Sequence, residues 1–234
     1  MGLQNRGNMT NNEMKITEKI TITNEDNMQL MARYPDNYFD LAIVDPPYGI
    51  GESGGKIRTN KKRPCYELRK KETKYTPKDW DNKRPEKEYW QELFRISKNQ
   101  IVWGGNYFVE HLPVSMGWIF WDKKNEGTVF SDGEMAFTSF KRGLKMYRLS
   151  SKHGTKGGKD KIHPTQKPIK LYEWILDNYA KPNDKILDTH LGSGSIAIAC
   201  HDYGFELTAC ELDKEYYDKA IQRIQNHVSQ QKLF

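Results

Sequence analysis

The sequence predicts an α/β fold class whose core is a mostly parallel β-sheet. Short apolar runs typical of buried strands alternate along the 234 residues with segments of helical periodicity. Two of these runs, residues 118–121 and 135–140, are joined by the turn-rich link DKKNEGTVFSDGE without an obvious helix, which predicts an antiparallel pair. A chain of this length suits one domain with a substantial core.

Seven runs are predicted to be strands because they are rich in β-branched, aliphatic and aromatic residues. They span residues 19–23, 41–44, 100–103, 118–121, 135–140, 185–187 and 205–210. Helical patterns fill several gaps: Pro85 is followed by EKEYWQELFRIS, and residues 214–228 repeat apolar side chains along one face. A further helix is expected to begin at Ser195, in the small-residue stretch SIAIAC.

Composition indicates a soluble globular protein in a reducing cytoplasm. No apolar run approaches the roughly 20 residues of a membrane span. The opening residues, MGLQNRGNMTNNEMK, lack the apolar core of a signal peptide, so we expect a disordered polar tail over residues 1–15 and one domain over residues 16–234. Cys65, Cys200 and Cys210 show no CxxC spacing, which predicts neither disulfides nor a metal site; the last two are expected to be buried.

Positive charge is concentrated in two segments. Residues 52–87 hold 13 Lys or Arg against 6 Asp or Glu, and residues 141–170 hold 10 against 1, whereas the whole chain carries only +6. Basic excess on an otherwise acidic body is the pattern expected for a polyanionic partner, although solvated loops would look the same in composition. We therefore predict two basic insertions that contact nucleic acid, at residues 50–87 and 141–162.

The stretch ILDTHLGSGSIAIAC predicts a strand, an acid at its end, and a glycine-rich turn that opens a helix. Such a turn lets a polar ligand approach backbone amides, and Glu211 at the end of the next strand is suited to binding ribose hydroxyls. The glycines also match the GxGxxA dinucleotide fingerprint, and in another interpretation they only cap a helix. A nicotinamide enzyme is disfavoured because only 39 residues follow Ser195 and Asp188 separates strand from glycines.

A second motif, LAIVDPPYGIG, ends a buried strand at Asp45. Pro46 and Pro47 contribute no backbone N–H, so this corner offers mainly acceptors, and Tyr48 offers an aromatic face. Acceptors in a donor-poor space suit an exocyclic amine of adenine or cytosine, and the ring suits stacking on a base. An ordinary strand-terminating turn is the other interpretation of this motif.

Together the two motifs resemble the amino-group DNA methyltransferases that use S-adenosylmethionine. The order of DPPY before LDTHLGSGS resembles the circularly permuted beta class, and the stretches IVWGGNYF and IHPTQKPIKLYEWIL are also similar to that family over residues 20–223. The resemblance implies a Rossmann-like S-adenosylmethionine-dependent methyltransferase fold, with a seven-stranded, mostly parallel sheet and one antiparallel strand. It also implies that the target base is flipped into the DPPY pocket.

The resemblance assigns site residues by motif. The catalytic residues would be Asp45, Pro46, Pro47 and Tyr48. The cofactor contacts would be Asp26, Asp45, His163, Thr165, Gln166, Lys167, Asp188, His190, Leu191, Gly192, Ser193, Gly194, Ser195 and Glu211. From the basic segments we expect DNA contacts at Lys56, Arg58, Lys61, Lys62, Arg63, Lys141, Arg142 and Lys145.

The implied activity is transfer of a methyl group from S-adenosylmethionine to N6 of adenine in double-stranded DNA. Asp before the prolines favours adenine by resemblance; N4 of cytosine, adenine in RNA, and an inactive nucleic-acid-binding subunit remain alternatives. A restriction endonuclease counterpart, and a monomer or a homodimer, stay open. Thr189 and His190 replace the usual Pro-Phe, so the packing on the cofactor's adenine is expected to differ.

Overall fold

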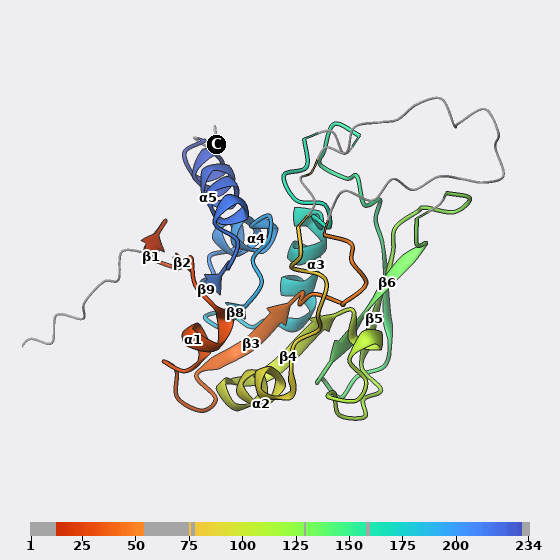
Figure 1. Cartoon of the computed structure of the whole chain (residues 1–234), viewed down its shortest axis with the longest axis horizontal. Coiled ribbons are helices and arrows are strands. Elements are labelled where there is room, and N and C mark those ends of the chain that lie inside the picture. Colours follow the sequence, from red (N-terminus) through yellow and green to blue (C-terminus); the bar gives the residue numbers. More distant parts are fainter. Residues whose placement is uncertain (1–12, 54–74, 76–77, 129, 158–159, 231–234) are drawn as a thin grey trace, which may run out of the picture.

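The computed structural model describes residues 13–53, 75, 78–128, 130–157 and 160–230. Within them, one nine-stranded sheet runs through the molecule in the order β1-β2-β9-β8-β3-β4-β6-β5-β7 (Figure 1). The strands are β1 (Glu13–Lys15), β2 (Ile20–Thr23), β3 (Phe39–Val44), β4 (Ser97–Trp103), β5 (Trp118–Asp122), β6 (Gly133–Thr138), β7 (Lys145–Arg148), β8 (Lys185–Asp188) and β9 (Glu206–Cys210). All seven predicted strands are confirmed.

The sheet has the predicted polarity. Strands β2, β9, β8, β3 and β4 pair in parallel, and β6 is antiparallel to both β4 and β5. This gives the predicted seven strands with one antiparallel member, and β1 and β7 are added at the two edges. Residues 13–15, expected in the disordered tail, instead form β1 against β2, and β7 lies inside the predicted insertion 141–162.

Helices cover both faces of the sheet. They are α1 (Asn27–Met31), α2 (Lys87–Ile96), α3 (Ile169–Tyr179), α4 (Ser195–Tyr203) and α5 (Lys214–Val228), with a 3₁₀ turn, η2 (Gly105–Tyr107). Asp213 begins α5 because its carboxylate accepts a hydrogen bond from the Tyr216 amide at 3.0 Å. No helix in the described ranges is long and apolar enough to cross a membrane.

Strand β3 shows why the sheet is buried on both sides. Leu41 and Ile43 pack with α3, α4 and α5, whereas Ala42 and Val44 pack with α1 and α2. Successive strand residues point to opposite faces, so a strand covered on both sides must be apolar at every position. Cys200 and Cys210 are buried in the same layers, as expected.

Candidate active site

The carboxyl edge of the sheet gathers the polar residues of both predicted motifs. Asp45 follows β3, Asp188 ends β8, Glu211 follows β9, and Gly104 follows β4. These four strands are parallel, so their carboxyl ends lie at the same edge, where α/β folds bind ligands. The catalytic motif and the glycine turn, about 140 residues apart in sequence, therefore meet in space.

At the catalytic motif, both oxygens of the Asp45 carboxylate accept hydrogen bonds. The Tyr48 hydroxyl donates to Oδ1 at 2.7 Å, and the Lys167 ammonium donates to Oδ2 at 2.5 Å. The Tyr48 ring stacks on Tyr107 with centroids 4.9 Å apart and planes 15° from parallel. Each oxygen of the Asp45 carboxylate therefore has a hydrogen-bond donor within the protein.

Gly104 makes room for the Tyr48 ring. Its φ of +66° is in the left-handed region, and a Cβ on Gly104 would lie only 2.2 Å from a ring carbon of Tyr48. Any side chain larger than hydrogen would collide with the ring. The IVWGGNYF stretch thus contributes a position that the Tyr48 ring requires.

Asp81 holds the turn that follows the catalytic motif. Its buried carboxylate accepts hydrogen bonds from the amides of Gly49 at 2.9 Å and Glu52 at 2.6 Å, and its carbonyl accepts one from Gly51 at 2.9 Å. Nearby, Arg84 donates to the Tyr107 carbonyl at 2.6 Å. The short segment 78–84 therefore fixes both the turn after Tyr48 and the residue on which Tyr48 stacks.

A buried chain of charges continues from Asp45. Lys167 also lies 3.1 Å from Glu134 Oε2, and Lys123 pairs with the other Glu134 oxygen. Burial alone would raise the pKa of Glu134, but Lys167 and Lys123 lower it to about 2. Burial disfavours the charged form of Lys167, yet Asp45 and Glu134 outweigh it and raise the pKa of Lys167.

The glycine turn is built from two left-handed glycines. Gly192 has φ +55° and Gly194 has φ +72°. A Cβ on Gly194 would lie 2.7 Å from Ile224 Cδ1, so close packing on α5 requires glycine there. Ser195 begins α4, and its hydroxyl donates to the Lys167 carbonyl at 2.8 Å and lies 3.2 Å from the Ser193 hydroxyl.

Two carboxylates flank this turn: Asp188 is buried and Glu211 is half-buried. Glu211 accepts hydrogen bonds from the amides of Gly192 at 2.8 Å and Asp213 at 2.9 Å, and Asp188 accepts one from the His190 amide at 2.9 Å. Burial raises the pKa of Glu211, and burial raises the pKa of Asp188 to about 8. The predicted ribose-binding acid therefore lies directly against the predicted turn.

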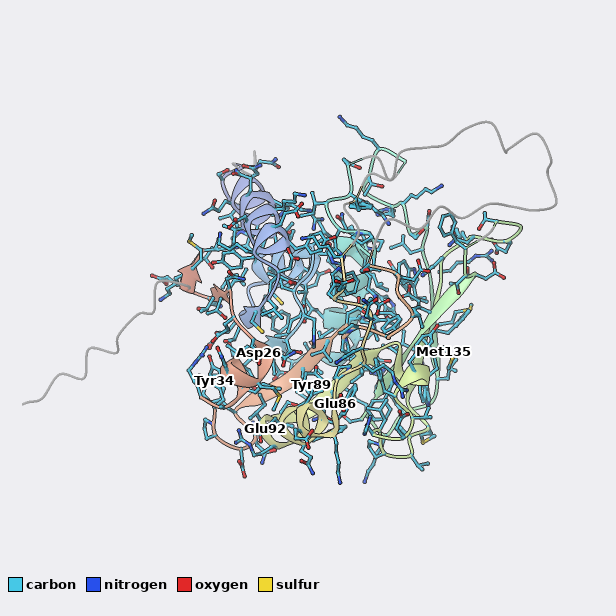
Figure 2. All side chains as sticks on the ribbon, in the orientation of Figure 1. Asp26, Tyr34, Glu86, Tyr89, Glu92 and Met135 are labelled. Atoms are coloured by element: carbon cyan, nitrogen blue, oxygen red, sulfur yellow. The ribbon has the colours of Figure 1, made fainter. Side chains whose placement is uncertain are left out.

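Thr189 and His190, which stand where the family usually has Pro-Phe, are held from the helices α1 and α2. The Thr189 hydroxyl lies 2.7 Å from the hydroxyl of Tyr89, labelled on α2 in Figure 2. His190 Nε2 lies 3.0 Å from Asn27 Nδ2. Burial lowers the pKa of His190 to about 3, which keeps the imidazole neutral. Side-chain hydrogen bonds therefore hold both residues, and the expected change in packing on the cofactor's adenine stays a prediction.

The predicted segment from His163 to Lys167 borders the glycine turn. The His163 ring lies between Trp80 and Tyr216, with centroids 5.2 and 4.3 Å away, and a Cβ on Gly192 would lie 3.8 Å from it. Burial and then Lys167 lower the pKa of His163 to about 3. For four other residues predicted to contact the cofactor, the structure gives the local environment, and their role stays a prediction. Thr165 is exposed, Gln166 accepts from the Ile162 amide, Leu191 is buried, and Asp26 caps α1 by accepting from the Met28 amide.

The predicted DNA contacts that can be located lie away from the catalytic motif, and their role stays a prediction. Lys56, Arg58, Lys61, Lys62 and Arg63 lie outside the described residues. Lys141 and Arg142 follow β6, which is antiparallel, and Lys145 begins β7, so all three lie at the amino edge, away from Asp45. Arg142 donates to the Asn178 carbonyl at 2.6 Å near the end of α3 and lies over the Tyr179 ring. Charge counts in the sequence do not indicate whether a loop lies at the amino or the carboxyl edge of the sheet.

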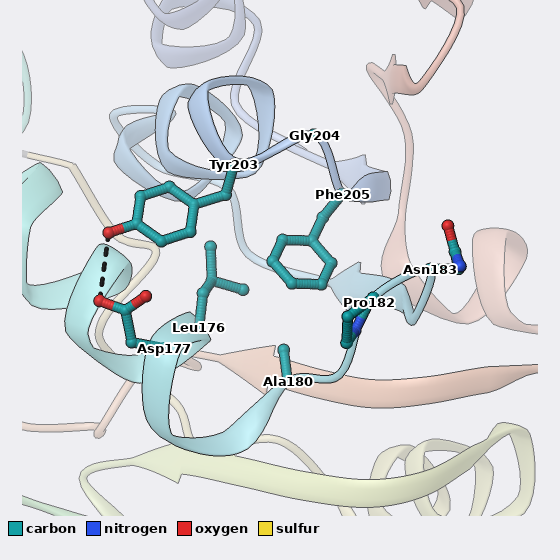
Figure 3. Close-up of a pocket in the computed structure, with 8 residues that line it drawn as sticks. All are labelled: Leu176, Asp177, Ala180, Pro182, Asn183, Tyr203, Gly204 and Phe205. Carbon is teal, nitrogen blue, oxygen red and sulfur yellow. Dashed lines mark hydrogen bonds between the residues drawn. The ribbon is translucent and has the colours of Figure 1, made fainter.

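A surface cavity of about 350 Å³ lies at the same amino edge (Figure 3). Leu176, Pro182 and Phe205 line it, and the Tyr203 hydroxyl donates to Asp177 at 3.1 Å across one side. Pro182 precedes β8 and Phe205 precedes β9, so this cavity is at the far end of the strands from the catalytic motif. It is not part of the candidate site.

Sequence reasoning missed several residues that the fold brings to the site. Glu134, Lys123, Asp81 and Trp80 come from a strand, a hairpin and a loop that no motif marks. A signal existed only for Lys123, which lies two residues after the predicted strand 118–121, at its carboxyl end. Trp103 is buried, and the Lys167 ammonium lies 5.1 Å from its ring centroid.

Comparison with known proteins identifies the family. The N6_N4_Mtase family, described as DNA methylase, matches residues 57–222, and the chain belongs to this family. It is 25% identical over 248 residues to the type II methyltransferase M.BglII of Bacillus subtilis, covering 86% of this chain and 68% of that protein. It is also 25% identical over 249 residues to M2.LlaDCHI of Lactococcus lactis subsp. cremoris, covering 88% and 90%.

Solved structures confirm the Rossmann-like methyltransferase fold. The crystal structure of an M1.HpyAVI-SAM complex superposes with a TM-score of 0.57 at 19% identity, over 87% of this chain and 98% of that one. PvuII DNA methyltransferase, described as cytosine-N4-specific, superposes with a TM-score of 0.57 at 13% identity, over 89% and 92%. At these identities the likeness concerns the fold.

Proposed function

We propose that this DNA methylase carries a methyl group from S-adenosylmethionine to the N6 amino group of adenine at a specific site in double-stranded DNA. The observation that carries the proposal is the meeting of Asp45 with the glycine turn at one sheet edge, joined through Lys167. A cytoplasmic location is part of the proposal. An amino group inside a duplex is out of reach of Asp45, so the base must leave the stack.

The chemistry of the edge fits S-adenosylmethionine. There is open space beside the Cα atom of Gly192, because a Cβ there would meet nothing closer than the His163 ring at 3.8 Å. The half-buried Glu211 and the buried Asp188 supply carboxylate oxygens on either side of the turn, which suit hydroxyl and amine donors. In the proposal these residues, together with Asp26 and the segment from His163 to Lys167, hold the cofactor.

The catalytic corner would act by accepting hydrogen bonds. When bound, S-adenosylmethionine supplies a methyl group activated by a sulfonium. The Asp45 carboxylate and the Pro46 carbonyl accept the two hydrogens of the target amine, which draws the nitrogen lone pair out of conjugation with the ring. The Tyr48 ring stacks on the base, which contributes about 1–3 kcal/mol. Positioning is the main source of rate in this scheme, and Asp45 or water receives the departing proton.

N4 of cytosine is the second candidate target. It is also a conjugated exocyclic amine, and the fold superposes on a methyltransferase described as cytosine-N4-specific. Asp45 before the prolines favours adenine by resemblance. Incubation with labelled S-adenosylmethionine and DNAs of varied sequence, followed by nucleoside analysis, separates the two: labelled N6-methyladenine is expected, and labelled N4-methylcytosine would replace the first proposal by the second.

Asp45→Ala should abolish methyl transfer and leave cofactor binding measurable by calorimetry. The change removes the carboxylate that accepts the amine hydrogens but leaves the glycine turn and Glu211 intact. Asp218→Ala is the matched control, because Asp218 is exposed on α5 in a surface pair with Lys214. Undiminished transfer by the Asp45 variant would refute its role, and absence of transfer by the unchanged chain to any DNA or RNA would favour a non-catalytic binding subunit.

A further inference from the structure

Lys167 connects the two motifs of the site through a single residue. Its carbonyl accepts from the Ser195 hydroxyl at 2.8 Å, at the start of α4. Its ammonium binds Asp45 Oδ2 at 2.5 Å and Glu134 Oε2 at 3.1 Å. The side chain is only 3% exposed, so its position is set by protein atoms rather than by water.

The two hydrogen bonds to Asp45 differ in kind. The Tyr48 hydroxyl on Oδ1 is a neutral donor, which an incoming amine can replace with an equivalent hydrogen bond. The Lys167 ammonium on Oδ2 is a buried ionic donor, and charge-assisted hydrogen bonds are roughly twice as strong. Removing it would leave a buried carboxylate without its counterion. Oδ1 is therefore the oxygen that a base can reach, and Oδ2 is the one that stays bound.

We propose that Lys167 is a positioning residue that holds the Asp45 carboxylate turned so that Oδ1 faces the target amine, while Glu134 binds the Lys167 ammonium and Lys123 binds Glu134. This inference rests on the proposed methyl transfer. It assigns the Lys167 side chain to the catalytic carboxylate, whereas the sequence motif placed the residue among the cofactor contacts. Glu134 and Lys123 belong to the same chain of ion pairs, although they are remote from both motifs in sequence.

Other titratable groups surround the chain of charges formed by Asp45, Lys167 and Glu134. Glu134 comes from β6, Tyr172 from α3 and Asp188 from β8, and each is close enough to interact electrostatically with Asp45 or with Lys167. Lys161 adds positive charge near Glu134. Lys167 is the cation of this group that contacts both carboxylates. Without it, Glu134 should take up a proton at a higher pH, because Lys167 is one of the two cations that lower its pKa.

The test is single-turnover methyl transfer by Lys167→Met across pH 5–9, beside Lys170→Met as the matched control. Lys170 is an exposed lysine nearby on α3, paired with Glu173. A misplaced catalytic group costs about 100-fold, so we expect a loss of that order for Lys167→Met at neutral pH. We also expect the acid limb of its rate profile to move to higher pH, because Glu134 loses a cation that lowers its pKa. The control should keep the rate and profile of the unchanged chain.

A double variant separates positioning from charge balance. Lys167→Met with Glu134→Gln removes one cation and one anion, leaving Asp45 and Lys123 balanced. Its melting temperature should return toward that of the unchanged chain even where Lys167→Met alone fails to fold. Its methyl transfer should stay about 100-fold down. Restored transfer in the double variant would overturn this inference but not the proposed function. An unshifted rate profile in Lys167→Met would do the same. A failure of the unchanged chain to methylate would overturn the proposed function as well.

Discussion

At the scale of single residues, Gly104 tests whether the position of Tyr48 matters. A Cβ there would lie 2.2 to 2.7 Å from three ring carbons of Tyr48, and φ is +66°. A left-handed backbone costs an L-residue roughly 1–2 kcal/mol, and displacement of the ring adds to this. Gly104→Ala should therefore lower both the free energy of unfolding and the rate of methyl transfer, measured by denaturant titration and single-turnover assay.

Gly127 provides the comparison for that substitution. It has φ +75°, and a Cβ there would meet nothing within 4 Å among the described residues. Gly127→Ala should cost only the backbone preference, roughly 1–2 kcal/mol of unfolding free energy, with methyl transfer retained. An equal effect of the two substitutions on transfer would show that contact with the Tyr48 ring is irrelevant to the reaction.

At the scale of elements, the segment 78–84 should determine how the turn after Tyr48 is held. The Asp81 carboxylate is 2% exposed and binds two amides of that turn, and each such bond to a charged group contributes roughly 1.5–3 kcal/mol. Asp81→Ala should destabilise the fold and raise the KM for DNA more than that for S-adenosylmethionine. Asp79→Ala removes an exposed neighbour whose side chain binds Asn82 within the described part of the chain, and it should change neither KM. Matching effects of both variants would argue against this role.

The elements that the sequence predicts are those whose side chains are buried. Strand β3 is apolar at nearly every position because helices cover both its faces, so its run is visible in the sequence. Strands β1 and β7 are short edge strands with charged residues, EMK and KMYR, and helix α1 has only five residues. Their stability comes from pairing and packing with distant segments, which leaves no local periodicity to detect.

The same reasoning explains which parts of the site could be predicted. Asp45, Tyr48 and the glycine turn lie in short motifs whose spacing reflects local backbone geometry. Glu134 reaches Lys167 because β6 inserts antiparallel beside β4, which brings the start of β6 to the carboxyl edge. Lys123, which follows β5, pairs with Glu134 at the same edge. That order of strands is a property of tertiary packing, so no single segment of the sequence contains it.

At the scale of the whole molecule, the two edges of the sheet carry different parts of the basic charge. Lys124 follows β5 and Lys152 follows β7, so both exposed lysines lie at the carboxyl edge of the sheet, on the side of Asp45. Lys141 and Lys145 are also exposed but belong to the amino edge. A duplex that delivers a base to Asp45 must approach the carboxyl edge, so only the first pair can lie close to its phosphates.

This difference gives a matched test of the DNA-binding face. Lys124→Ala with Lys152→Ala should weaken DNA binding and reduce the slope of log affinity against log salt by about 0.9 for each phosphate that the variant no longer neutralises. Lys141→Ala with Lys145→Ala removes the same charge from the far edge and should leave the slope unchanged, since charges beyond a Debye length of about 8 Å at physiological salt are largely screened. Binding titrations at several salt concentrations measure both. A larger reduction from the amino-edge pair would mean that DNA binds across the strand starts, which is incompatible with delivery of a base to Asp45.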